Sequence, residues 1–276
     1  MKTRIITAIV LLCVFIPVFW FSYTIVFPAV IGLISLIGVY EYLKCVGYDK
    51  KPAIYVPACG MAGVIPVCAN YSHGTAFFVI LLAVSFAYMF YLFAYAVFHH
   101  GKVSFSSVAG VFTGVFYILF SFTCLVIIRR IPNGEYIYLL AFIGAWVTDT
   151  FAYFTGWLFG RHKLIPEVSP KKTIEGSVGG TVFCIGAFIL YGFIIGETTD
   201  ISPNYIALGV VALFVSVISQ IGDLVFSLIK REHGVKDYGK LFPGHGGVLD
   251  RFDSVIPVSV VLLIFMSLSE RFSFFA

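Results

Sequence analysis

The segment from Ser227 to Ser254, SLIKREHGVKDYGKLFPGHGGVLDRFDS, is the densest polar stretch of the chain. Its PGHGG run frees the backbone to turn N–H groups toward an anion. Asp250 and Asp253 offer hard carboxylate oxygens suited to Mg²⁺. Side chains able to donate to phosphate oxygens are Lys230, Arg231, Lys236, Lys240 and Arg251. The pattern favours metal-assisted phosphoryl or nucleotidyl transfer, and the alternative is that the positive charges only bind anionic lipid headgroups.

Two more acids lie within strongly apolar stretches. Asp149 occurs in GAWVTDTFAYFTGWLFG and Asp223 in VSVISQIGDLVFSLIKR. An ionised side chain at the bilayer centre costs about 2.5–3.5 kcal/mol on insertion scales, so such acids are functional candidates. Asp223 precedes Lys230 by seven residues, which at helical rise puts it about 10 Å below the polar segment. The alternative is that a buried Lys or Arg neutralises each acid and the pair only packs helices.

A second basic segment, RHKLIPEVSPKKTIEGSVGG, precedes another apolar stretch. Ser169, Lys171, Lys172 and Thr173 could hold phosphates there, and the following glycines permit close backbone approach at a helix start. Headgroup binding is again the alternative. The chain has no GxxxxGK[ST], no GxSxG and no HExxH, so common nucleotide, nucleophile and zinc motifs of soluble enzymes are missing.

The rest of the chain must position these polar segments within lipid. Of 276 residues, 60% are apolar and only 12% are charged, far from the balance of a water-soluble domain. The apolar residues form long continuous runs, which predicts an all-α polytopic membrane protein rather than a β-barrel. About nine transmembrane helices are expected, at Ile5–Phe21, Tyr23–Leu43, Ala53–Ala69, Thr75–Phe98, Ser107–Ile128, Tyr136–Phe159, Val178–Ile195, Tyr205–Ile229 and Ser254–Leu268.

The distribution of positive charge predicts the orientation. With nine spans and a cytoplasmic N-terminus, 15 of the 18 Lys and Arg residues fall on the cytoplasmic side and the C-terminus lies outside. We expect one integral-membrane domain, 1–276. Residues 1–128 form N-terminal scaffold spans, and residues 129–276 form a catalytic half with cytoplasmic loops 160–177 and 230–253. None of the six cysteines forms CxxC, so they are interpreted as packing residues.

The second half of the chain resembles the integral-membrane phosphatidate cytidylyltransferases, or CDP-diacylglycerol synthases. Their signature is S-x-x-K-R-x4-K-D-x-G-x2-[LIF]-P-x-H-G-G-x2-D-R-x-D. All of its fixed positions occur here, as Ser227, Lys230, Arg231, Lys236, Asp237, Gly239, Pro243, His245, Gly246, Gly247, Asp250, Arg251 and Asp253. The QIGDL, DTFAYFTG and SPKKTIEG stretches also look like family segments, so the resemblance covers roughly 149–254.

The resemblance implies that CTP and phosphatidic acid react to give CDP-diacylglycerol and pyrophosphate, with Mg²⁺. It implies Asp223 and Asp250 as metal ligands. Residues expected to hold the triphosphate or pyrophosphate are Lys230, Arg231, Lys236, Lys240, His245 and Arg251. Ser169, Lys171 and Lys172 are expected at the phosphatidate headgroup or the nucleotide, two roles that stay unseparated. Further substrate-binding residues are Asp149, as a third ligand or an orienting acid, with Ser227, Asp237, Gly246, Gly247 and Asp253.

The expected partners are CTP, phosphatidic acid and membrane lipid, in a bacterial inner membrane and with no nucleic acid. The glycine-rich first half leaves a homodimer open. A transporter is the alternative from another class. Its acids would be spread along the depth of the bilayer, whereas the polar residues here are expected to concentrate at one face. A CDP-alcohol phosphotransferase would carry D-G-x2-A-R-x8-G-x3-D-x3-D, which is absent. A CTP-dependent lipid kinase, such as a dolichol or phytol kinase, is disfavoured only by the full signature.

Overall fold

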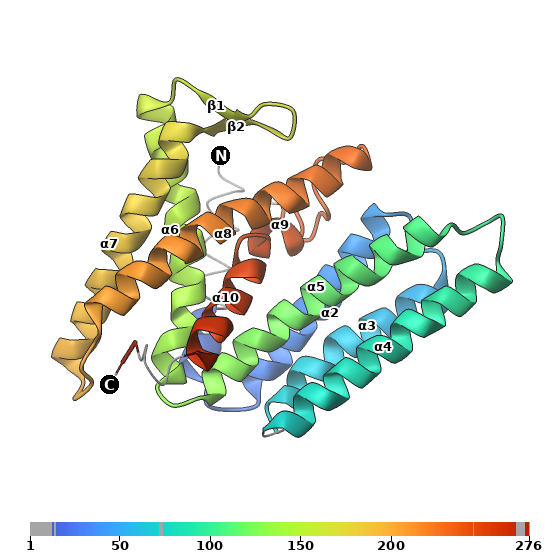
Figure 1. Ribbon diagram of the computed structural model, residues 1–276, viewed down its shortest axis with the longest axis horizontal. Coiled ribbons are helices and arrows are strands. Elements are labelled where there is room, and N and C mark those ends of the chain that lie inside the picture. The colour runs from blue at the N-terminus through green and yellow to red at the C-terminus, as the bar shows by residue number, and fades with distance from the viewer. Residues whose placement is uncertain (1–12, 14, 72–73, 245, 269–273, 276) are drawn as a thin grey trace. The chain divides into compact units, whose positions relative to one another are not determined.

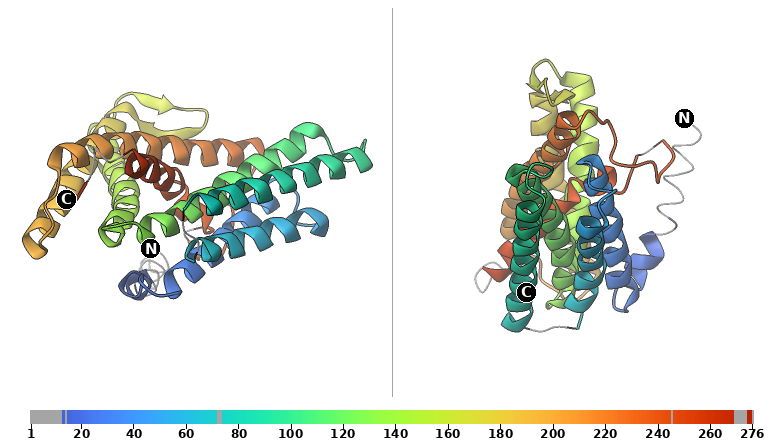
Figure 2. Two further views of the ribbon diagram at one scale, coloured as in Figure 1. Left: turned by 60° about the horizontal axis from the view of Figure 1, so that its bottom comes forward. Right: turned by 90° about the vertical axis from the view of Figure 1, so that its right-hand side faces the viewer.

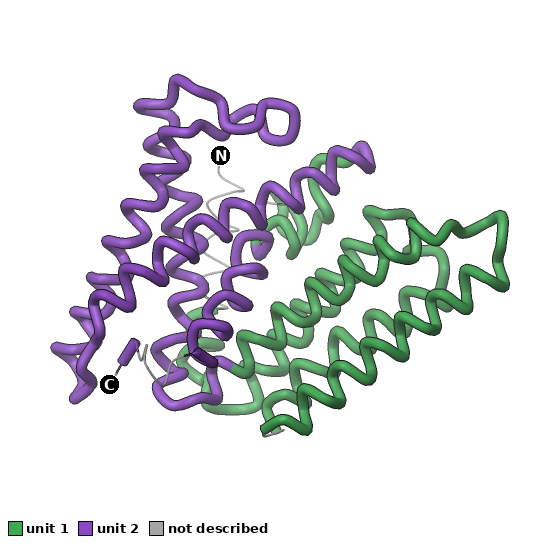
Figure 3. The backbone as a smooth tube through the Cα atoms, viewed as in Figure 1, with its two compact units in different colours: residues 1–127, 235–251 green, residues 128–234, 252–276 purple. Residues whose placement is uncertain are grey.

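The computed structural model describes residues 13, 15–71, 74–244, 246–268 and 274–275 (Figure 1). Within it the chain forms two compact units (Figure 3). The first unit combines residues 1–127 with 235–251, and the second combines residues 128–234 with 252–276. The polar segment found in the sequence is therefore divided, since 235–251 packs with the N-terminal helices.

The first unit is a group of helices running side by side (Figure 2). Close contact between two of them requires glycine, because a Cβ on Gly32 would lie 2.6 Å from the Gly63 carbonyl oxygen. The Tyr42 hydroxyl donates a 2.7 Å hydrogen bond to the Gly110 carbonyl and so joins helix α2, which carries Tyr42, to helix α5, which carries Gly110. The helices are α2 (Val26–Cys45), α3 (Pro52–Ala69), α4 (Thr75–Phe98) and α5 (Phe105–Arg130), whose last residues belong to the second unit.

The second unit consists of long helices and one β-hairpin. Its helices are α6 (Gly134–Phe159), α7 (Ile174–Thr198), α8 (Tyr205–Glu232) and α10 (Val255–Ser267). The short α9 (Leu249–Phe252) has its first three residues in the first unit and Phe252 in the second. Strand β1 (Lys163–Ile165) pairs antiparallel with β2 (Ser169–Thr173). The Thr173 hydroxyl ends the hairpin and caps α7, accepting a 3.1 Å hydrogen bond from the Gly176 N–H.

Small residues bring α6 and α7 together. A Cβ on Gly180 of α7 would lie 2.7 Å from the Thr148 carbonyl oxygen of α6. Helices in lipid associate through such close backbone contacts, because lipid offers no hydrophobic drive between them. Helix α8 packs against α7, and α10 packs against both α8 and α6. This arrangement carries the acidic residues of α6 and α8 and the basic hairpin in one unit.

The predicted architecture is confirmed at the level of a helical polytopic membrane protein. In the described part of the chain, seven helices, α2 to α8, are long and apolar enough to cross a membrane. Their bounds lie within four residues of the predicted spans, and α4 matches its span at both ends. Helix α10 has only 13 residues, short of the roughly 20 that a crossing needs. The predicted span Ile5–Phe21 falls largely outside the described residues, so the count of nine stays a prediction.

The close contact of α6 and α7 predicts a stability difference between two glycines of the same helix. Gly180→Val forces atoms into the Thr148 carbonyl, and overpacking of this kind costs about 1–3 kcal/mol. The control is Gly186→Val, because nothing lies within 4 Å of a Cβ built there. We expect the Gly180 variant alone to lower the thermal unfolding midpoint in detergent by several degrees. Equal midpoints for both variants would contradict this packing.

Candidate active site

An ion pair joins the hairpin to α8 in the second unit. The Lys172 ammonium at the end of β2 lies 2.5 Å from Oδ2 of Asp223, and both side chains are about a quarter exposed (23% and 24%). The Ser227 hydroxyl, one turn further along α8, donates a 3.3 Å hydrogen bond to the other oxygen, Oδ1. Lys172 also donates to the Gln220 carbonyl at 3.5 Å. Three predicted site residues, Lys172, Asp223 and Ser227, are thus brought together at a partly solvated position.

A second polar contact joins α6 to the start of α10. The Ser254 hydroxyl donates a 2.7 Å hydrogen bond to Oδ2 of Asp149. The Ser254 backbone N–H donates a 2.9 Å bond to Oδ1 of Asp253, which is buried. One serine therefore links the acid inside α6 to the last acid of the signature. The local chain order explains the geometry, because Asp253 and Ser254 directly precede the first residue of α10.

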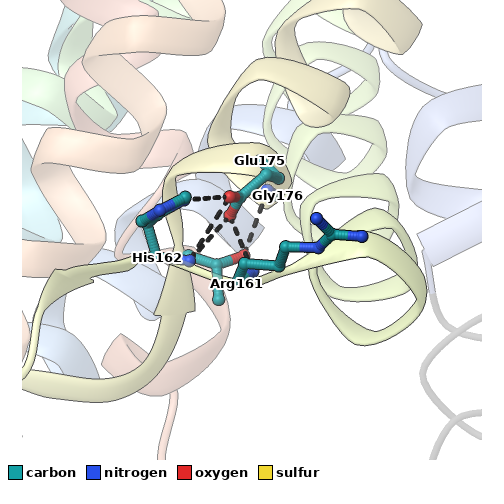
Figure 4. A network of polar contacts seen from close by, with 5 residues as sticks. Arg161, His162, Glu175 and Gly176 are labelled. Carbon is teal, nitrogen blue, oxygen red and sulfur yellow. Dashed lines mark hydrogen bonds and ion pairs between the residues drawn. The ribbon is translucent and has the colours of Figure 1, made fainter.

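The base of the hairpin is closed by a carboxylate from the first turn of α7 (Figure 4). Glu175 accepts backbone hydrogen bonds from Arg161 at 3.1 Å and from His162 at 3.2 Å. The His162 ring nitrogen Nδ1 lies 2.6 Å from its other oxygen. This network ties the chain entering β1 to the helix that follows β2. It therefore orients the strand that carries Ser169, Lys171 and Lys172.

The glycine loop of the signature is organised by Asp250 within the first unit. Oδ2 of Asp250 accepts backbone hydrogen bonds from Tyr238 at 2.8 Å and from Gly247 at 2.9 Å. The Phe242 N–H donates a 2.9 Å bond to the Gly246 carbonyl and closes the turn between them. Gly246 has φ +84°, a left-handed conformation that suits glycine. The predicted glycine loop is thus a defined turn, with a buried carboxylate at its base.

The remaining predicted residues differ in exposure. Lys230 is buried, whereas Arg231, Lys236, Asp237, Lys240 and Arg251 are exposed, as is Lys171 on the hairpin. His245 lies outside the described residues. Asp223 belongs to the second unit and Asp250 to the first, so their pairing as metal ligands stays a prediction. The structure brings together Lys172 with Asp223, Asp149 with Asp253 through Ser254, and Asp250 with Gly247.

One residue near the signature loop was not predicted from the sequence. Glu41, on α2, is buried and its Oε2 accepts a 3.0 Å hydrogen bond from the Leu249 N–H, 208 residues later in the chain. The sequence interpretation treated residues 1–128 as scaffold and confined the site to the second half. A signal was available, since Glu41 is the one acid in the apolar run Tyr23–Leu43 and acids in such runs are functional candidates.

These features define a class of protein. The chain is a helical, polytopic membrane protein in which a carboxylate on an apolar helix contacts a glycine loop in the first unit, and another contacts a basic hairpin in the second unit. Carboxylates supply ligands for a hard cation, and lysine, arginine and turned backbone amides supply donors to phosphates. Such a set suits the transfer of a phosphorylated group to a membrane lipid by positioning and charge neutralisation.

Comparison with known proteins identifies the family within this class. Residues 2–269 match the cytidylyltransferase family, and the chain belongs to that family. It is 37% identical over 271 residues to the phosphatidate cytidylyltransferase of Staphylococcus haemolyticus, covering 96% of this chain and 100% of that protein. The protein of the same name from Staphylococcus aureus strain COL is also 37% identical, over 96% of this chain and 99% of its own length. The Staphylococcus saprophyticus protein is 34% identical.

The Glu175 network predicts that one carboxylate keeps the hairpin ordered. Glu175→Ala removes the acceptor for two backbone N–H groups and the partner of His162, so we expect trypsin to cleave after Lys163 and Lys171 several-fold faster. The control is Glu167→Ala, because Glu167 is exposed on the hairpin turn. Cleavage can be followed by mass spectrometry of the protein in detergent. Unchanged rates in the Glu175 variant would show that the network does not hold the hairpin.

Proposed function

We propose that the protein is a phosphatidate cytidylyltransferase, which transfers CMP from CTP to phosphatidic acid and releases pyrophosphate. The observation that carries this proposal is the 37% identity, over 96% of the chain, to a relative of that name. The complete signature between Ser227 and Asp253 supports it. Membrane-spanning helices suit an enzyme whose one substrate is a lipid and whose other substrate is a soluble nucleotide.

The proposed reaction is an in-line displacement at phosphorus. A phosphate oxygen of phosphatidic acid attacks the α-phosphorus of CTP, a new P–O–P linkage forms, and the bond to the β-phosphate breaks. Pyrophosphate leaves with its electron pair. The attacking phosphate is already ionised at neutral pH, so little general-base work is needed. Acceleration would come from alignment of the two substrates and from neutralisation of charge on the phosphates.

Side chains of this chain suit both tasks. Lys172 is held beside Asp223 by the 2.5 Å ion pair, and with Ser169 and Lys171 it would bind a phosphate of either substrate. The amides of Gly244 and Gly246 would face the triphosphate or pyrophosphate, while the Gly247 N–H donates to Asp250. Further donors to that group would be Lys230, Arg231, Lys236, Lys240, His245 and Arg251. Asp149, linked to Asp253 through Ser254, would orient substrate.

Magnesium is the cofactor proposed for this chemistry, and the donor set fits it. Asp223 and Asp250 are proposed as its protein ligands, since each presents a carboxylate from an ordered element. Among the described residues, no three or more His, Cys, Asp or Glu side chains are grouped so that they could hold a metal ion by themselves. Magnesium commonly binds through one or two carboxylates together with substrate phosphates and water. When bound, it would neutralise charge on the phosphates.

The finer topology is part of the same proposal. We infer nine spans, a cytoplasmic N-terminus and an external C-terminus in a bacterial cell membrane, supported by the 15 of 18 Lys and Arg residues that then lie on the cytoplasmic side. Full-length chain fused at its C-terminus to alkaline phosphatase, which is active only outside the cytoplasm, should give active fusions. A fusion to green fluorescent protein at the same point should be dark. The reverse result would contradict an odd number of spans with this N-terminus.

The activity is tested with purified protein in detergent, phosphatidic acid, Mg²⁺ and radiolabelled CTP. We expect label in a lipid product together with an equal amount of pyrophosphate. Label in the lipid from γ-labelled CTP would instead indicate a lipid kinase. If folded protein gives neither product with several acyl chains, or with Mn²⁺ in place of Mg²⁺, the proposed function is wrong.

The proposed role of Asp223 predicts that its substitution sharply lowers turnover, while substitution of Lys44 does not. Asp223→Asn removes the charge that pairs with Lys172 and would bind the cation, so turnover should fall by at least about 100-fold. Asp250→Asn should show a comparable loss. The control is Lys44→Ala, an exposed position of α2, which should keep turnover within a few-fold. Near-normal turnover in folded Asp223→Asn protein would remove Asp223 from the metal site.

A further inference from the structure

The carboxylate of Glu41 is built into the base of the signature loop. Glu41 lies on the last turns of α2 and is 6% exposed. Its Oε2 accepts the 3.0 Å hydrogen bond from Leu249 N–H, one residue before Asp250. One turn earlier on the same helix face, Gly38 leaves room for the Leu249 side chain, because a Cβ there would lie 3.1 Å from Leu249 Cδ2. Helix α2 thus holds Leu249 by both its backbone and its side chain.

The same carboxylate fills the space beside two glycines of the signature. A Cβ on Gly239 would overlap Oε1 of Glu41, and a Cβ on Gly247 would overlap the whole carboxylate group. Gly247 has an ordinary backbone conformation, since it is not among the residues with positive φ. Its lack of a side chain is therefore explained by the approach of Glu41 rather than by a special turn. Gly239 and Gly247, eight residues apart in the chain, thus both contact the same carboxylate.

Asp250 and Glu41 accept different backbone N–H groups of the loop and its flanks. Asp250 accepts N–H groups of Tyr238 and Gly247 from within the segment, while Glu41 accepts the N–H of Leu249 from α2. We propose that Glu41 is a positioning residue for the cytidylyl transfer, whose carboxylate sets the glycine loop and Asp250 in their working geometry. This inference rests on the proposed function, but the geometry that it requires is testable without it.

The first test compares Glu41→Ala and Glu41→Gln with the wild type. A misplaced site costs about 100-fold per ångström, so Glu41→Ala should lose about 10- to 100-fold in kcat. Its KM for CTP should rise, while the KM for phosphatidic acid should stay within about threefold, because the loop is assigned to the triphosphate. Glu41→Gln keeps an oxygen acceptor for Leu249 N–H and should lose less. The matched control is Asp49→Asn, an acid-to-amide change just beyond the same helix, which should be near wild type.

A double-mutant cycle tests the contact itself. Gly247→Ala in the wild-type background should lower turnover by about tenfold, because its methyl group overlaps Glu41. In the Glu41→Ala background the space is vacated, so the same change should cost no more than about twofold. Gly60→Ala serves as the control, since nothing lies within 4 Å of a Cβ there. Losses that simply multiply would overturn the proposal.

Limited proteolysis supplies a measurement that does not depend on activity. Lys236 and Lys240 are exposed on the loop, and trypsin should cleave after them several-fold faster in Glu41→Ala protein. Cleavage after Lys163 of the hairpin should keep its wild-type rate. If the wild type lacks cytidylyl transfer but the loop loosens, the proposed function is wrong, while the holding of the loop by Glu41 stands. If the wild type is active and both kcat and cleavage are unchanged in Glu41→Ala, the positioning role is wrong.

Discussion

A carboxylate on an apolar helix must find donors or a cation, and this requirement governs how the polar parts of the molecule attach to its helices. Leaving such a group unpartnered away from water costs several kcal/mol. Asp223 meets the requirement with Lys172 of the hairpin, Asp149 with Ser254 before α10, and Glu41 with Leu249 of the signature loop. The partners of Asp223 and Glu41 lie on polar segments, the hairpin and the signature loop, whereas Ser254 directly precedes the apolar helix α10. Asp223 and Glu41 therefore attach these polar segments to helices of their own units.

The long helices were predictable because a bilayer crossing imposes a length and a composition. Helix α4 begins and ends at the predicted residues, and α3 continues through Pro57 and Pro66, which are tolerated in such helices. The signature segment could also be predicted from the sequence, because its glycines and charged residues occur at fixed spacing. The predicted last span, Ser254 to Leu268, contains the 13-residue helix α10, so its crossing of the membrane stays a prediction.

Two parts of the site depended on contacts that a linear sequence hides. The hairpin from Lys163 to Thr173 has no alternation of apolar residues and reads as a polar loop, yet its ends are held by Glu175 and by the Thr173 cap. Glu41 accepts from a backbone N–H 208 residues away, so no side-chain type marks its partner. The one signal in the sequence was that Glu41 is the single acid in an apolar run. Predicted residues were thus found by type, and the residue that supports them was found by geometry.

A loop rich in glycine has little rigidity of its own, because glycine has no side chain to restrict its backbone conformation. Two carboxylates accept N–H groups of the loop and its flanks, Asp250 from within the segment and Glu41 from α2. A carboxylate suits that place, because its oxygens accept the backbone N–H groups of Tyr238, Gly247 and Leu249. The chemistry proposed here relies on alignment of the substrates rather than on a strong base. Keeping the loop ordered, as these two acids do, would therefore contribute directly to the rate. That is a physical reason for a helix in the first half of the chain to carry a buried glutamate.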